Sequence, residues 1–374
     1  MAYQVSRELV KKKHEVVVYT SDAGDFGSRL RIDPDNNVNG IKVRYFRNFA
    51  LTPVKKLKLF ITPQLVSRAN KEVEKFDVIH LHEYRTFQNI VIAHYAKKYG
   101  VPYVLQAHGS IPRIMARQRL KWIYDVLFGY SLLRNASKVI ALSQMEAEQY
   151  RGVGVPEEKI EIIPNGIDLS EYSDLPSKGS FKKKFSIDED EKIILYLGRI
   201  HRIKGLDFLV KAFANIVVKL EDVRLVVVGP DDGYLSELQT LIKTLKIEDD
   251  VLISGPLYGR DKLEAYVDAD VYVLPSRYEM WAMTVLETYA CGKPVIASRV
   301  GGLKDLVIDG VTGLLVEPRD IKQLANSIRY LLNNDDKAEE IGLRGKEFVE
   351  ENFAIEKMVD RLEDLYEDAT RDNC

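Results

Sequence analysis

Short runs of β-branched and other apolar residues alternate with amphipathic stretches along the whole chain. This alternation is typical of βαβ units, in which helices join parallel strands and cover both faces of the sheet. The expected strands of the first half are Glu15–Thr20, Ile41–Arg44, Asp77–His82, Pro102–Gln106, Lys138–Leu142 and Lys159–Ile163. Those of the second half are Lys192–Leu197, Arg224–Gly229, Val251–Ser254, Val271–Leu274, Pro294–Ala297 and Gly313–Val316.

The elements divide into two sets, each large enough for its own doubly wound sheet. The 374 residues also exceed what one hydrophobic core usually serves. Periodicity fades at Leu169–Lys184, and the turn signal Pro164-Asn165-Gly166 precedes this stretch, with Asn165 as the expected hinge. We therefore predict domains at residues 1–170 and 171–354. A closing helix, Ile355–Thr370, has apolar residues at helical spacing along one stripe.

The beginning of the chain departs from the usual order of a parallel α/β sheet. Tyr3–Lys13 has the pattern of a helix, and the first strand follows only at Glu15. Such sheets normally begin with a strand and a glycine-bearing turn. The expectation is that a first strand and its glycine loop are missing, although a variant of the fold would give the same order.

Composition and charge narrow the class of protein. Only two cysteines, Cys291 and Cys374, occur, which excludes a disulfide framework and a thiolate metal site. There is no signal-peptide pattern and no apolar run long enough for a membrane span, so we expect a cytoplasmic protein. Residues 1–170 carry 26 Lys and Arg against 17 Asp and Glu, and the remainder carries 28 against 39. The basic half either meets an anionic partner or has drifted in charge.

Two groups of residues in the second half have a pattern suited to a phosphorylated ligand. In Leu197-Gly198-Arg199 a strand ends in a glycine that allows close backbone approach, and Lys204 follows. An arginine fork and a lysine suit a diphosphate. Glu279 and Glu287 flank the start of an expected helix, whose free N–H groups suit a phosphate. If the segment runs from loop into helix, both carboxylates lie on broadly the same side.

Further candidates follow other strands. Gly301-Gly302 allows a tight turn or a close approach to substrate. In the first half, His108 follows a strand and precedes a glycine, a suitable place for proton exchange. His80 and His82 alternate on one strand face, but no third ligand at matching spacing appears, so a packed role is expected rather than a metal site.

Two stretches of the basic half mix cations with bulky apolar residues, Pro53–Ile61 and Arg113–Leu133. Basic, aromatic-rich helices of this kind can lie in a membrane interface. The alternative is a helix that packs its apolar side into the core and exposes its charges. Of the two arrangements we expect the second.

These motifs together strongly resemble the retaining glycosyltransferases of family 4, which have the GT-B fold. The resemblance extends over nearly the whole chain and is most specific between Val271 and Pro318. The matching motifs are Glu279-x7-Glu287, Gly292–Ser298, Val300-Gly301-Gly302, Gly313–Pro318, Leu197-Gly198-Arg199 with Lys204-Gly205, Ile163–Asp168, Asp77–His82 and the strand leading to His108.

The resemblance implies an α/β protein with two doubly wound, Rossmann-like domains that face a central cleft, and a last helix that crosses back to the first domain. It also implies roles for individual residues. Arg199 and Lys204 would bind the donor diphosphate beside Gly198, and the backbone of Ala282, Met283 and Thr284 would bind its phosphates. Glu279 would hold hydroxyls of the transferred sugar, and Glu287 would hold the ribose. Tyr258 would lie in the segment that contacts the base, and His108 would lie across the cleft from the donor.

The implied reaction transfers a sugar from a UDP- or GDP-linked donor to a hydroxyl of a glycan, a lipid-linked acceptor or a small molecule, with retention. No cofactor, metal or nucleic acid is expected, and contact with the inner membrane face through the basic half is a further expectation. This family usually has glycine at the positions of Met280 and Ala282. The Cβ of Ala282 narrows the space in which the backbone approaches a phosphate. A nucleotide-sugar epimerase, a donor-binding protein with little turnover and a pyridoxal-phosphate phosphorylase are the alternatives.

Overall fold

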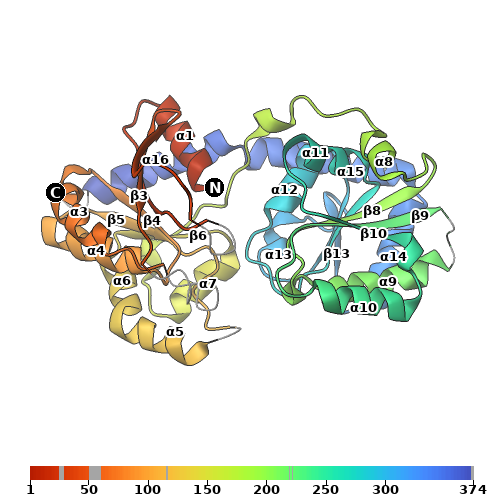
Figure 1. Ribbon diagram of the computed structural model, residues 1–374, viewed down its shortest axis with the longest axis horizontal. Helices are drawn as coiled ribbons and strands as arrows, with labels where there is room; N and C mark the ends of the chain where they lie inside the picture. Colours follow the sequence, from red (N-terminus) through yellow and green to blue (C-terminus); the bar gives the residue numbers. More distant parts are fainter. Residues whose placement is uncertain (25–28, 50–59, 115–116, 219, 221, 372–374) are drawn as a thin grey trace. The chain divides into compact units, whose positions relative to one another are not determined.

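The computed structural model describes residues 1–24, 29–49, 60–114, 117–218, 220 and 222–371. The chain forms two compact units (Figure 1). Unit 1 contains Met1–Gly166 and Ile355–Cys374, and unit 2 contains Ile167–Ala354. The first boundary therefore falls at Gly166 rather than at residue 170, and the last helix belongs to the first unit.

Unit 2 contains a six-stranded sheet in which every strand is parallel to its neighbours, in the order β10-β9-β8-β11-β12-β13. Its central strands are almost entirely buried, as their continuous apolar sequences predict. The strands are β8 (Lys192–Leu197), β9 (Val223–Val228), β10 (Val251–Gly255), β11 (Val271–Leu274), β12 (Val295–Ser298) and β13 (Gly313–Val316).

The strand order reverses between β8 and β11, and this reversal sets where helices and ligands lie. Right-handed crossovers that proceed in opposite directions from a central strand place helices on opposite faces of the sheet. Ligands collect outside the carboxyl ends of the strands at such a reversal. The helices are α8 (Ser180–Phe185), α9 (Leu206–Val217), α10 (Leu235–Leu245), α11 (Gly259–Asp268), α12 (Met283–Ala290), α13 (Leu303–Leu306), α14 (Ile321–Leu332) and α15 (Asp335–Asn352).

Unit 1 contains two sheets instead of the single sheet expected from the sequence. A parallel sheet has the order β4-β5-β6-β7, and a smaller one has the order β1-β3-β2. The strands are β1 (Val17–Ser21), β2 (Asp35–Val38), β3 (Ile41–Phe46), β4 (Ile79–His82), β5 (Tyr103–Gln106), β6 (Lys138–Ala141) and β7 (Ile160–Ile162). The helices are α1 (Ala2–Lys11), α3 (Gln64–Glu72), α4 (Phe87–Tyr99), α5 (Gln118–Tyr124), α6 (Tyr130–Asn135) and α7 (Gln144–Gly152).

The closing helix α16 (Ile355–Arg371) packs into unit 1 along the stripe that its sequence predicts. Its apolar residues share a core with α1 and with strands β5 and β6. Lys12, directly after α1, forms ion pairs of 2.6 Å with both Asp360 and Glu363 of α16. The core stripe consists of Ile355, Met358, Val359, Leu362 and Leu365, with Tyr366 partly buried against it.

Candidate active site

The loops that follow β8, β11 and β12 meet at the reversal point of the unit 2 sheet, where the sequence motifs predict the site. Gly205 makes this approach possible. Its φ is +71°, and an added Cβ would lie 1.9 Å from the carbonyl oxygen of Pro275, so only glycine fits without displacement. The backbone N–H of Arg277 donates to the carbonyl of Ile203 over 2.8 Å. The β8 loop is thereby fixed against the β11 loop.

This contact brings Lys204 next to Glu279, and the two side chains form an ion pair. Both are largely shielded from solvent, with 16% and 11% of the side chains exposed. The hydroxyl of Ser276 donates to the Glu279 carboxylate over 3.4 Å. The N–H of Gly302 donates to the Glu279 carbonyl over 3.0 Å, so the Gly301-Gly302 turn lies in the same cluster. Elements far apart in sequence thus meet around Glu279.

Arg199 begins the loop that carries Lys204. It follows Gly198 at the end of β8, and its carbonyl accepts a 2.8 Å hydrogen bond from the hydroxyl of Tyr196. The guanidinium is 57% exposed and forms an ion pair with Asp232. An exposed ion pair of this kind contributes little to stability, so the guanidinium can exchange Asp232 for a ligand anion at small cost.

Helix α12 begins in the same region, with Ala282 as its first flanking residue and no side chain capping it. The backbone N–H groups of Met283 and Thr284 belong to the first turn, where N–H groups lack partners within the helix. The Thr284 hydroxyl is held by the hydroxyl of Tyr272 over 2.6 Å, and burial raises the pKa of Tyr272 and keeps it protonated. The turn therefore presents oriented donors to an anion.

Glu287 lies one turn further along α12 and is held by residues that the sequence did not single out. Its carboxylate accepts hydrogen bonds from Lys262 over 3.0 Å and from the hydroxyl of Tyr266 over 2.8 Å. Both partners lie on α11, four residues apart and so on one face. Tyr258, just before α11, is 75% exposed. Because α12 begins at Met283, Glu279 lies in the loop before the helix and Glu287 lies within it, so the segment runs from loop into helix as expected.

His108 belongs to unit 1, where it follows β5 with a φ of +51°. Its Nε2 lies 2.9 Å from Nδ1 of His82, and the two rings stack. His80 stacks on the other side of His82, and its Nδ1 lies 2.7 Å from the hydroxyl of Tyr366. Burial lowers the pKa of His82 to about 4 and that of His108 to about 3. Both imidazoles are therefore neutral at physiological pH, and one ring nitrogen donates to the other.

The backbone beside His108 is held by Glu146, a buried carboxylate that sequence reasoning missed. It accepts hydrogen bonds from the N–H of Gly109 and, over 2.8 Å, from the N–H of Leu142. Burial raises the pKa of Glu146 to about 7. The loops after β5 and β6 are thus connected through one side chain. Asn165, the expected hinge residue, is buried at the end of unit 1.

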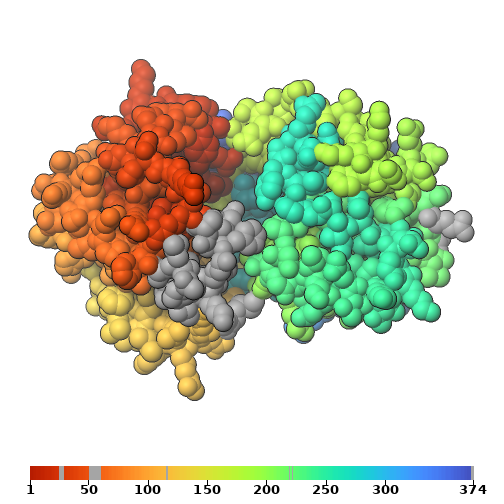
Figure 2. All heavy atoms as spheres, viewed as in Figure 1, coloured from red at the N-terminus to blue at the C-terminus, as the bar shows by residue number. Residues whose placement is uncertain are grey.

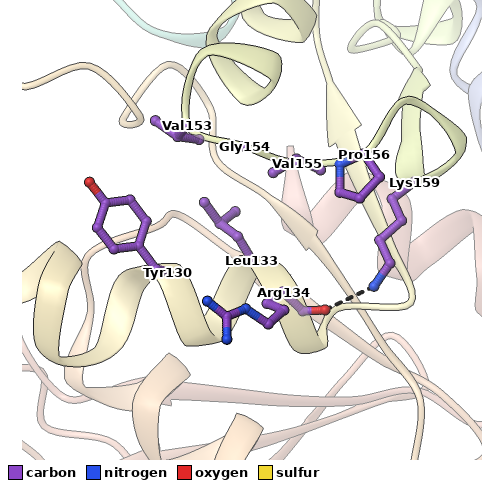
Figure 3. A pocket seen from close by; sticks show the side chains of 8 residues that line it. All are labelled: Tyr130, Leu133, Arg134, Val153, Gly154, Val155, Pro156 and Lys159. Carbon is purple, nitrogen blue, oxygen red and sulfur yellow. Dashed lines mark hydrogen bonds between the residues drawn. The ribbon is translucent and has the colours of Figure 1, made fainter.

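A cavity of about 350 Å³ lies elsewhere in unit 1 (Figure 3). Its lining includes Tyr130, Leu133, Arg134, Val155 and Lys159, and Lys159 donates to the carbonyl of Arg134 over 2.8 Å. These residues precede strands β6 and β7, so the cavity lies at the amino ends of the strands, opposite the edge where ligands collect. Among the described residues, no three His, Cys, Asp or Glu side chains are grouped as metal ligands.

Comparisons with known proteins agree with this geometry. Residues 1–171 match the family model described as Glycosyltransferase Family 4, and residues 177–348 match the one described as Glycosyl transferases group 1. A D-inositol 3-phosphate glycosyltransferase of Actinosynnema mirum is 30% identical over 74% of this chain and 70% of that protein. An N-acetyl-alpha-D-glucosaminyl L-malate synthase of Bacillus anthracis is 28% identical over 99% of this chain and 93% of that protein.

Solved structures show the same architecture. A sucrose-phosphate synthase from Thermosynechococcus elongatus superimposes with a TM-score of 0.78 at 25% identity, over 98% of this chain and 92% of that one. Anabaena HepE, in complex with UDP and glucose, superimposes with a TM-score of 0.74 at 23% identity, over 87% of this chain and 86% of that one. The fold is therefore GT-B, and this chain is a glycosyltransferase that belongs to family 4, glycosyl transferases group 1.

Proposed function

We propose that this glycosyltransferase transfers a hexosyl group from a nucleoside diphosphate sugar to an acceptor hydroxyl, with retention of anomeric configuration and without a metal ion. The observation that carries the proposal is the Lys204–Glu279 pair beside the first turn of α12. A cation, a carboxylate and unpaired backbone N–H groups meet there. The cation and the N–H groups can bind a diphosphate, and the carboxylate can accept hydrogen bonds from the hydroxyls of a sugar attached to it.

Each group has a part in the proposed reaction. Breaking the bond between the anomeric carbon and the phosphate oxygen leaves negative charge on the nucleoside diphosphate. Arg199, Lys204 and the N–H groups of Met283 and Thr284 stabilise that charge as it develops. The Lys204 ammonium has three N–H donors, so it can bind a phosphate oxygen while it keeps Glu279. Glu279 accepts hydrogen bonds from hydroxyls of the transferred sugar.

The leaving phosphate also serves as the base that deprotonates the acceptor hydroxyl. The acceptor oxygen bonds to the anomeric carbon on the face that the phosphate leaves, and the departing phosphate oxygen takes the hydroxyl proton. No cofactor besides the nucleotide sugar is required. Glu287, oriented by Lys262 and Tyr266, binds the ribose hydroxyls, and the neutral His108 donates a hydrogen bond to the sugar.

A panel of UDP- and GDP-sugars, each with glycan, lipid-linked and small-molecule acceptors, tests the proposal. We expect transfer with one donor class in the presence of a chelator, and product of unchanged anomeric configuration by NMR. Lys204→Ala should lower kcat/KM by about 10²–10³. Arg202→Ala is the matched control, because Arg202 is an exposed cation only two residues away.

Other outcomes contradict the proposal in distinct ways. Conversion of the donor without any acceptor would indicate an epimerase. Donor binding with neither transfer nor hydrolysis would indicate a binding protein. Unchanged kinetics in both Arg199→Ala and Lys204→Ala would exclude charge stabilisation by this pair.

A further inference from the structure

The helical segment from Gln118 to Asn135 has an unusual outward face. It consists of α5, a π-helical turn at Asp125–Gly129 and α6. Its inward side is formed by Asp125, Gly129, Leu132 and Leu133, all buried. A surface helix of a globular protein normally presents polar residues on the opposite side. Here that side is mainly apolar, and the exposed apolar residues are Leu120, Trp122, Ile123, Val126, Leu127 and Phe128.

The extent of exposure is large for side chains of this size. Trp122 is 53% exposed and Leu127 is 62% exposed. The segment lies at the edge of unit 1, where Figure 1 labels α5. The same region of unit 1 lies on the molecular surface in the space-filling view (Figure 2). The expectation that this helix packs its apolar residues into the core is therefore wrong. Contiguous exposed apolar side chains usually mark a surface that meets an apolar partner.

The charged side chains of this part of the chain that reach solvent all have one sign. Between residues 113 and 135 the charged residues are Arg113, Arg117, Arg119, Lys121, Arg134 and Asp125. The single acid, Asp125, is buried and accepts two hydrogen bonds of 2.8 Å from Arg85. Within the described residues of 113–135 the exposed side chains therefore include apolar residues and cations but no acid.

We propose that the segment Gln118–Asn135 docks unit 1 onto an anionic phospholipid bilayer. The apolar side chains enter the boundary between headgroups and acyl chains, and the flanking cations bind lipid phosphates. A protein partner with an apolar groove would not by itself account for the uniform positive charge. None of the helices in the described part of the chain is long and apolar enough to cross a membrane. The other basic stretch, Pro53–Ile61, lies almost entirely outside the described residues.

The inference does not depend on the proposed function, since membrane binding is measured without donor or acceptor. The test is flotation of the full chain with vesicles of phosphatidylcholine alone and of phosphatidylcholine mixed with phosphatidylglycerol. We expect flotation with the anionic vesicles only, weakened by added salt. The chain has only two tryptophans, and Trp281 is buried. Anionic vesicles should therefore shift the emission of the exposed Trp122 to the blue, and lipids brominated on the acyl chain should quench it.

Variants separate the two contributions. The combination Ile123→Ser, Val126→Ser and Leu127→Ser should weaken binding to anionic vesicles by at least about tenfold. Arg119→Gln with Arg134→Gln should weaken it and reduce its dependence on salt. The matched control is Val218→Ser, Tyr330→Ser and Leu343→Ser, because these exposed apolar residues lie on unit 2. All variants replace exposed side chains, and circular dichroism verifies that each is folded.

Several results would overturn the proposal. Absence of flotation by the wild-type chain, or equal flotation with neutral vesicles, would exclude an anionic bilayer as the partner. Equal binding by the serine variant and the control would exclude this face. If the serine variant instead abolished a concentration-dependent dimer, the surface would be an interface between copies of this chain.

Discussion

At the scale of single residues, the most informative side chains are buried polar groups whose partners come from distant parts of the sequence. His108 is one of them, because it carries a proposed role and also holds a left-handed backbone conformation. Asparagine tolerates that conformation better than most residues. We therefore expect His108→Asn to fold like the wild type and to lower kcat, whereas His108→Ala adds backbone strain of about 1 kcal/mol or more. Initial rates and thermal midpoints of both variants distinguish the two effects.

The same histidine cluster predicts how stability depends on pH. Burial holds the pKa of His82 at about 4 and that of His108 at about 3, against about 6.5 in an unfolded chain. Between these values the two histidines bind more protons in the unfolded chain than in the folded one, so their contribution to the free energy of unfolding decreases as the pH falls below about 6.5. Each histidine should remove roughly 1–2 kcal/mol by a pH of about 5.

Denaturant titrations at a pH of about 7 and about 5 measure this dependence. Replacing His82 and His108 together by asparagine should remove the part of it that these histidines contribute. His94→Asn is the control, because His94 is exposed and belongs to the same unit. An equal pH dependence in the double variant and the wild type would show that these imidazoles are not held neutral.

At the scale of elements, the approach of the β8 loop to the β11 loop depends on Gly205. Gly205→Ala places a Cβ against the carbonyl of Pro275 and also strains a backbone with φ of +71°. We expect a lower thermal midpoint and weaker donor binding, because the loop that carries Lys204 must move away from Glu279. Gly310→Ala is a matched control, since Gly310 has a similar φ of +75° and open space around its Cα. If both variants lost the same stability and kept donor affinity, backbone strain alone would explain the effect.

The strands show how far the sequence determines these elements. Every expected strand is present, with boundaries that differ by at most a few residues, because buried parallel strands require continuous apolar runs. The exposed strand β2 was missed, since Asp35–Val38 has no apolar pattern. Its signal lay in Asn39-Gly40, a pair typical of tight hairpins, and both residues have positive φ. The division of unit 1 into two sheets depends on pairing between distant strands, which periodicity does not specify.

The site shows a similar limit. The motifs predicted which loops meet at the reversal point of the unit 2 sheet, because the carboxyl ends of parallel strands share one edge. They did not predict that Lys204 pairs with Glu279, or that Lys262 and Tyr266 hold Glu287. These contacts depend on how helices and loops pack. The sequence also did not predict that the apolar residues of Gln118–Asn135 face outward, because an apolar stripe does not indicate whether that side of a helix packs against the core.

At the scale of the whole molecule, the division into two units assigns the proposed donor site to one of them. All the residues proposed to bind the nucleotide and its phosphates lie in unit 2, which has its own parallel sheet and a covering of helices. A domain with its own core can fold alone. The separate chain Ile167–Ala354 should therefore fold and bind the donor nucleotide.

Calorimetric titration of Ile167–Ala354 and of the full chain with UDP and with GDP measures this directly. For the nucleotide that the full chain binds, we expect dissociation constants that agree within about tenfold, because a loss of about 1.4 kcal/mol corresponds to that factor. Glu287→Gln in the fragment should weaken binding, since Glu287 is the proposed ribose ligand. A fragment that is folded by circular dichroism but does not bind would show that unit 1 supplies an essential part of the nucleotide site. Binding by the fragment without transfer would place the nucleotide site in unit 2 and show that transfer requires unit 1.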